Sequence, residues 1–280
     1  MTARWEVSSR YPGVQETLTE VWQHRDLLRF VGGRALRKMY RRTVLGWLWL
    51  FINPLFPVAL RALVFGGLLG VGSDGLPYFL FLIAGTVIWE VFSTSMMWGT
   101  RALEMNRDLS GQVYHPRAIL PFGNMTPSLL NLALKVGVFL LALAFYTVRD
   151  GRNYLRGDWA LLLAIGALAL ALLFAMALSF FTSILGENTR DMRFALGGIM
   201  SVWYLLTPVL YPLSQVPAEY RGWILLNPLA IIVETFKWAL FGVGEFYAAA
   251  FAATTVGVLL LLFGGLVYFT RREARVIAER

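Results

Sequence analysis

Cysteine is absent from this sequence, and histidine occurs only twice, at His24 and His115. Without cysteine there is no disulfide framework, no thiolate metal site and no cysteine nucleophile. The chain also lacks a G-x-x-x-x-G-K-S/T phosphate loop, an H-E-x-x-H motif and a G-x-S-x-G motif. We therefore predict that it holds no metal or cofactor, carries no catalytic site and does not bind ATP through a phosphate loop.

Charged residues are also scarce. They make up 15% of the chain, hydrophobic residues make up 58%, and the mean hydropathy is +0.60. A soluble domain is about half apolar and a quarter charged. The formal charge of +8 is compatible with nucleic-acid binding, but the cations lie beside hydrophobic segments, where anionic lipid headgroups are the expected partner. We predict an integral membrane protein that binds lipids and no nucleic acid.

Six segments are apolar enough to cross a bilayer, which takes roughly 20 residues. The cationic stretch 34–43 precedes the first of them, and Lys and Arg favour the cytoplasmic side of short loops. The predicted fold is therefore an all-α membrane protein with both termini inside. It has a cytoplasmic segment 1–43, a six-span domain 44–270 and a basic tail 271–280. The predicted spans are 44–70, 77–99, 119–147, 159–184, 194–213 and 247–270.

The remaining cations agree with this direction. Most fall on the predicted inner side, and the loop 149–156 is the one exception on the outer side. Within the first span, Pro54 and Pro57 predict a kink rather than a break, because neighbouring helices can satisfy the freed carbonyls. Arg61 falls roughly 26 Å along this span, so its long side chain is expected to reach the outer headgroups.

Two segments are not plain spans. Residues 13–30 have an amphipathic pattern that predicts an interfacial helix on the inner leaflet, either alone or also as the frame of a docking surface. Residues 214–242 lie between the fifth and sixth spans, where Pro217 and Pro228 separate apolar pieces too short to cross. We predict short re-entrant or interfacial helices on the outer side, which form either a gate or a structural lid.

Ionisable residues inside the predicted spans are few. Glu90 lies roughly 20 Å from the outer end of the second span. An acidic group at that depth is either functional or directed into the bundle, where it is protonated or paired. Lys135 lies in the third span, and its long stem is expected to reach an interface.

Aromatic residues accompany Glu90 inside the spans. Trp89 and Trp203 lie near mid-depth, beside Phe92 and Tyr204. Packing against lipid is one interpretation of these rings. The other is a row of flat apolar faces along which a sugar polymer slides without strong directional bonds. On the second interpretation, the four rings and Glu90 line a channel for such a polymer.

Four stretches resemble one family of transport proteins. The first, 34–50, is a basic collar followed by Thr43, Leu45, Gly46, Leu48 and Trp49. The others are 106–121 with Tyr114, Pro116, Arg117 and Pro121; Arg190 and Asp191 followed by 207–212; and 227–230 with Glu234, Phe236 and Lys237. In this order they make the chain similar to the membrane subunit of polysaccharide ABC exporters, the Wzm-type permeases of O-antigen, capsule and teichoic-acid export.

The resemblance implies a homodimer working with two copies of a separate ATPase, which binds ATP and Mg²⁺. The cargo would be a polysaccharide on a polyprenyl-diphosphate lipid, moved across the bacterial inner membrane. The cytoplasmic loops would couple to the ATPase through Arg101, Glu104, Asn106, Arg107, Asp108, Tyr114, His115, Arg190 and Asp191. An external gate would contain Tyr211, Tyr220, Trp223, Asn227, Glu234 and Lys237.

Two other interpretations stay open. A drug or small-lipid exporter of related architecture would show the same pattern of spans. A membrane-bound transferase would need a polar catalytic cluster at one face. The only candidates for such a cluster, Asp108, His115 and Asp191, are scattered along the sequence.

Overall fold

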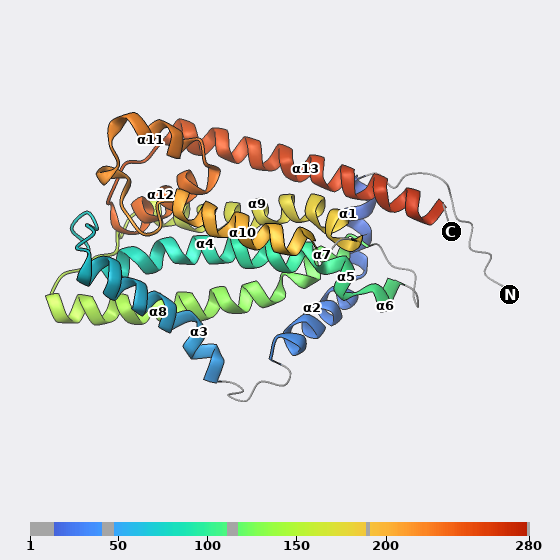
Figure 1. The fold of residues 1–280 in the computed structure, drawn as a ribbon, viewed down its shortest axis with the longest axis horizontal. Coiled ribbons are helices and arrows are strands. Elements are labelled where there is room, and N and C mark those ends of the chain that lie inside the picture. The colour runs from blue at the N-terminus through green and yellow to red at the C-terminus, as the bar shows by residue number, and fades with distance from the viewer. Residues whose placement is uncertain (1–13, 41–47, 111–116, 189–190, 279–280) are drawn as a thin grey trace.

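The computed structural model describes residues 14–40, 48–110, 117–188 and 191–278, and the regular structure among them is entirely helical. Four long helices run along the long axis of the molecule, each packed on the next, in the order α13, α9, α4, α8 (Figure 1). Their bounds are Ala248–Ala278 for α13, Ala160–Asn188 for α9, Tyr78–Thr100 for α4 and Thr126–Asp150 for α8. These helices form the frame on which the shorter elements are placed.

Apolar helices of membrane-spanning length account for four of the predicted spans. Within the described residues, four segments are long and apolar enough to cross a bilayer. They are Tyr78–Thr100, Ile119–Asp150, Ala160–Glu187 and Ala248–Arg272. The second combines α7 (Ile119–Asn124) with α8, which has Pro127 in its first turn. The chain is therefore a multi-pass membrane protein, as its hydropathy predicted.

The other two predicted spans correspond to shorter helices. They are α3 (Trp49–Arg61), which continues into the π-helical segment η2 (Ala62–Leu68), and α10 (Asp191–Leu206). The α3 helix runs through Pro54 and Pro57 without a break, as predicted. The α10 helix ends just before Thr207 and Pro208, because proline disfavours the helical conformation of the residue before it. The apolar stretches Ile52–Leu68 and Phe194–Leu206 are shorter than 18 residues, so six crossings remain a prediction.

The short helices gather at the two ends of the bundle (Figure 1). At one end lie α1 (Val14–Gln23), α2 (Arg25–Tyr40), α5 (Ala102–Met105), α6 (Arg107–Ser110) and the end of α13. At the other end lie η3 (Leu213–Gln215), α11 (Ala218–Leu225) and α12 (Pro228–Phe241). The helix predicted over 13–30 is thus two helices with a turn at His24, and it extends further than its amphipathic pattern indicated.

Two buried clusters hold these elements together. The larger is centred on α4, where Leu80, Ile83 and Phe92 have no exposed surface. The smaller lies at the α1–α2 end and joins Val31 of α2 to Phe180 of α9. Many large apolar side chains of α8, α9 and α13 point outward instead, among them Phe145, Ile165, Leu260 and Phe263. An apolar exterior around an apolar core suits helices surrounded by lipid.

Candidate functional site

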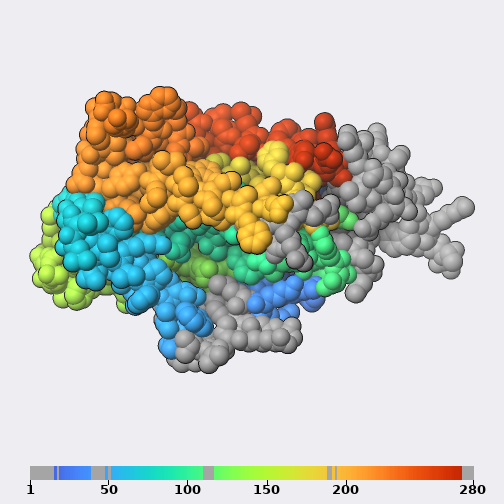
Figure 2. Space-filling view, in the orientation of Figure 1, coloured from blue at the N-terminus to red at the C-terminus, as the bar shows by residue number. Residues whose placement is uncertain are grey.

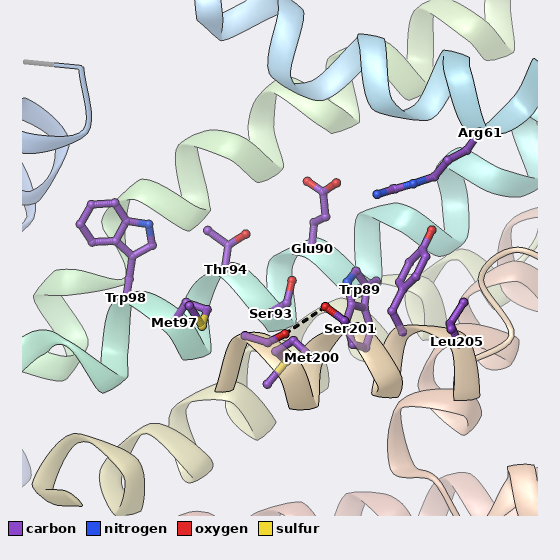
Figure 3. Close-up of a pocket in the computed structure, with 12 residues that line it drawn as sticks. Arg61, Trp89, Glu90, Ser93, Thr94, Met97, Trp98, Met200, Ser201 and Leu205 are labelled. Atoms are coloured by element: carbon purple, nitrogen blue, oxygen red, sulfur yellow. Dashed lines mark hydrogen bonds between the residues drawn. The ribbon is translucent and has the colours of Figure 1, made fainter. Parts of the chain in front are cut away.

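A pocket of about 520 Å³ opens between α3, α4 and α10. On the face shown in Figure 2, α10 crosses the molecule and α4 is visible between α10 and α3. The pocket wall includes Trp89, Glu90 and Ser93 from α4, Ser201 and Tyr204 from α10, and Arg61 from α3 (Figure 3). It therefore combines charged, hydroxyl and aromatic groups inside a predominantly apolar bundle.

An ion pair joins two helices beside this pocket. Lys135 Nζ on α8 lies 2.8 Å from Glu90 Oε1 on α4, with 3% of the Lys135 side chain exposed and 28% of the Glu90 side chain exposed. Lys135 also donates to the carbonyl oxygen of Pro54 in α3, at 3.5 Å. The acidic group is thus paired within the bundle, one of the two alternatives the sequence left open, and Lys135 is buried instead of reaching an interface.

Arg61 of α3 also lines the pocket. Its guanidinium lies 5.0 Å from the centre of the Tyr204 ring, and it points from α3 toward Glu90 (Figure 3). The side chain turns into the pocket because α3 packs beside α4 and α8. The expectation that it reaches the outer headgroups stays a prediction. A cationic side chain within an apolar span was the signal that could have indicated it.

The four aromatic residues predicted to line a channel divide into two pairs. Trp89 and Tyr204 line the pocket, with their ring centres 5.2 Å apart. Phe92 and Trp203 lie behind them, where the Phe92 ring is 5.3 Å from Trp203 and 5.1 Å from Phe174 of α9. The structure therefore brings Trp89, Glu90 and Tyr204 together at one surface and places Phe92 and Trp203 in the supporting core.

The segment predicted as an external gate is joined to α10 by one asparagine. Asn227 caps α12 by accepting a hydrogen bond from the backbone amide of Leu229, at 3.0 Å. The same side chain accepts from Trp203 Nε1 at 2.9 Å and donates to Thr207 Oγ1 at 3.0 Å. Asn227 therefore ties the end of α10 to the start of α12.

The α12 helix is itself deeply buried. Lys237 Nζ donates to the carbonyl oxygen of Pro208, lies 3.5 Å from Glu234 Oε1, and is 3.7 Å from the centre of the Phe81 ring. Tyr211 donates to the carbonyl of Leu205, at 3.1 Å. By contrast, α11 is exposed, and its Tyr220 and Trp223 side chains are 56% and 73% exposed. The predicted gate thus has a buried part, α12, and an exposed part, α11, which meet at a 104° bend.

At the opposite end, the first predicted coupling loop is fastened to α2. Arg34 Nη2 lies 2.9 Å from Asp108 Oδ2, and Lys38 Nζ donates to the carbonyl of Met105 at 2.8 Å. The pKa of Lys38 is lowered by partial burial and by the nearby Arg34 and Arg101, while Asp108 raises it. The segment formed by α5 and α6 is therefore held against α2 by one ion pair and by one hydrogen bond from a lysine.

Two buried asparagine side chains, Asn106 and Asn124, connect the same loop to α7. Asn106 donates to Asn124 Oδ1 at 3.1 Å and to the carbonyl of Ala102 at 2.8 Å. Arg117 lies 3.8 Å from Glu187 near the end of α9, which connects the first loop to the second. The remaining predicted coupling residues are placed as follows: Arg101 and Glu104 are half-buried, Arg107 and Asp191 are exposed, and Tyr114, His115 and Arg190 lie outside the described residues.

The described residues contain no group of three or more His, Asp or Glu side chains able to hold a metal ion. Of the three residues considered for a transferase, Asp108 and Asp191 lie in the first turns of separate helices, α6 and α10. The third, His115, lies in the part of the chain that the structure leaves undescribed. The geometry therefore offers a pocket and two end surfaces and no assembled catalytic cluster among the described side chains.

The sequence is similar to those of known membrane transport proteins. Residues 27–241 match the family described as ABC-2 type transporter. The O-antigen export system permease protein RfbA of Myxococcus xanthus is 29% identical over 91% of this chain and 95% of its own length. A protein of the same name from Klebsiella pneumoniae is 27% identical over 87% and 93%. The polysialic acid transport protein KpsM of Escherichia coli is 24% identical over 86% and 92%. The chain belongs to the ABC-2 type transporter family.

Proposed function

We propose that this protein is the membrane subunit of an ATP-driven exporter that moves a polysaccharide, linked to polyprenyl diphosphate, across the bacterial inner membrane. The observation that carries the proposal is similarity to an O-antigen export permease and to a polysialic acid transport protein, in each case along most of both chains. The polyprenyl carrier is part of the proposal because a long hydrophilic glycan needs an apolar anchor to stay at the membrane.

The proposed topology has six spans and places both termini inside. The end of the bundle that holds α1, α2, α5 and α6 carries more cations than the end that holds α11. By the positive-inside rule, the first end faces the cytoplasm. Residues 1–43 and 271–280 then lie on the inner side and 44–270 form the membrane domain. The α1–α2 pair rests on the inner leaflet, and α11 and α12 form the outer gate.

The exporter is proposed to be a homodimer that binds two copies of a separate ATPase. The sequence has no phosphate loop, so ATP and Mg²⁺ need another chain to bind them. Beside the pocket, α10 exposes Phe194, Val202 and Leu205, each 60% exposed or more. A second copy covering this face would bury apolar surface and enclose the pocket between two subunits.

Coupling to the ATPase can be tested at Arg107. Its side chain is exposed on α6, so a change to glutamate leaves the membrane bundle intact. If the α5–α6 loop docks on the ATPase, reversing this charge is expected to lower the amount of co-purified ATPase and to reduce export at least tenfold. The measurement is ATPase-to-permease stoichiometry after affinity purification, with export followed in cells.

Arg152 provides the matched control for this charge reversal. It is also an exposed arginine, but it lies in the loop between α8 and α9 at the opposite end of the bundle. Arg152→Glu is expected to leave ATPase binding unchanged. Equal ATPase loss in both variants would mean that the effect comes from general instability, and no loss in Arg107→Glu would contradict docking at this loop.

Depletion of the protein in its native host tests the cargo. A polysaccharide exporter leaves its completed polyprenyl-linked glycan inside the cell when it is removed, so extracts of depleted cells are expected to contain more of this lipid, measured by mass spectrometry. A drug or small-lipid exporter would leave the glycan lipid at its normal amount and change drug tolerance or lipid distribution instead. That second result would overturn the polysaccharide assignment.

A further inference from the structure

The pocket between α3, α4 and α10 carries an excess of positive charge. Arg61 and Glu90 line it, and Lys135 is paired with Glu90 beside it, so two cations stand against one carboxylate that is already paired. From this excess we propose, on the basis of the proposed export function, that Arg61 binds an oxyanion of the cargo, a carboxylate or a phosphate. Trp89 and Tyr204 would contact the sugar next to that oxyanion.

The case for an anionic ligand starts from the state of Arg61. In the described part of the chain, its guanidinium makes no ion pair with a carboxylate, and Glu90, the one acidic residue among those that line the pocket, is already 2.8 Å from Lys135. A cation within a membrane domain is costly unless it pairs or faces water. An incoming oxyanion offers the planar guanidinium two parallel hydrogen bonds and balances its charge.

The pocket also has groups suited to a carbohydrate. Trp89 and Tyr204 line its wall in an edge-to-face contact, and Arg61 lies over the Tyr204 ring, so an oxyanion on Arg61 would place the attached sugar beside that ring. The Ser93 and Ser201 hydroxyls are on the same wall. Ser201 donates to the carbonyl of Gly197 at 3.0 Å, which leaves its oxygen able to accept from a sugar hydroxyl.

The charge of Arg61 is therefore expected to make the pocket bind acidic sugars more tightly than neutral ones. A neutral sugar would keep the aromatic and hydroxyl contacts and lose only the contact with Arg61. Since a hydrogen bond to a charged group is stronger than a neutral one, removing the guanidinium is expected to weaken binding of an acidic ligand about tenfold or more. Binding of a neutral ligand would change little.

The test measures binding of three probes to the intact permease–ATPase complex in lipid nanodiscs. Trigalacturonate carries carboxylates, maltotriose is a neutral sugar, and farnesyl diphosphate carries the phosphates of a polyprenyl carrier. Each probe is titrated against the unaltered protein, Arg61→Gln and Arg61→Lys. Arg61→Gln is expected to raise the dissociation constant of at least one anionic probe tenfold, while Arg61→Lys recovers part of the affinity because it keeps the charge.

The two anionic probes distinguish the source of the oxyanion. Loss confined to trigalacturonate assigns the pocket to acidic sugars of the polymer, and loss confined to farnesyl diphosphate assigns it to the lipid carrier. The proposal is overturned if the unaltered complex binds neither anionic probe, if Arg61→Gln binds both as the unaltered complex does, or if maltotriose binding falls equally. Basal ATP hydrolysis and ATPase stoichiometry are recorded in parallel, so failure of the export function would appear as an unaltered permease that binds no ATPase.

Discussion

Replacing Lys237 with methionine is expected to lower the free energy of unfolding by about 3–5 kcal/mol. The side chains of Lys237 and Glu234 are 2% and 6% exposed. Methionine occupies a similar volume but removes the cation, so the Glu234 carboxylate is left buried without its partner. The carbonyl of Pro208 also loses a donor, which loosens the connection between α10 and α12.

The measurement is the thermal unfolding midpoint of the purified protein in detergent, followed by the fluorescence of its 10 tryptophans. The double variant Glu234→Gln/Lys237→Met removes both charges and is expected to recover most of the lost stability, because the cost comes from one buried charge left alone. If the single variant unfolded at the normal midpoint, the pair would have to be hydrated rather than buried. Failure of the double variant to recover would assign the loss to the Pro208 contact instead.

Replacing Gly99 with valine is expected to destabilise the bundle by about 3 kcal/mol, at the upper end for overpacking. Gly99 is where α4 crosses α9: a Cβ atom built on it would lie 2.7 Å from the Cβ atom of Ser179 and 2.3 Å from its Oγ atom. Neither helix can yield by a side-chain rotation alone, because the Ser179 Cβ atom is attached to the backbone. The helices would have to separate, which undoes the close approach that small residues allow in membranes.

Gly137 on α8 is the control for this substitution. It also lies within a long apolar helix, but a Cβ atom built on it meets nothing within 4 Å apart from its own stretch of helix. Gly137→Val is therefore expected to keep a nearly normal unfolding midpoint. Changing Ser179 to glycine in the Gly99→Val background opens space at the crossing and is expected to restore part of the stability. Equal midpoints for Gly99→Val and Gly137→Val would disprove the close α4–α9 contact.

The pocket shows how far the sequence could predict the site. Trp89, Glu90 and Phe92 were selected for their depth in one span, yet Phe92 packs behind the pocket that the other two line. Trp203 and Tyr204 are neighbours in sequence but point to different sides, because successive residues turn by about 100° around a helix. The depth of a residue in the membrane follows from its position along the span. Which side it faces depends on the rotation of the helix about its axis, and that rotation is set by the neighbouring helices.

Composition and hydropathy by themselves determined that the chain is an all-helical membrane protein and located the four long apolar helices. These properties depend on the transfer of each segment into lipid, which is nearly independent of the other segments. Only the tertiary structure decided that Lys135 meets Glu90 and that Arg61 faces the same pocket. Those contacts join residues on three helices, and which faces meet is set by packing between helices, on which hydropathy carries no information.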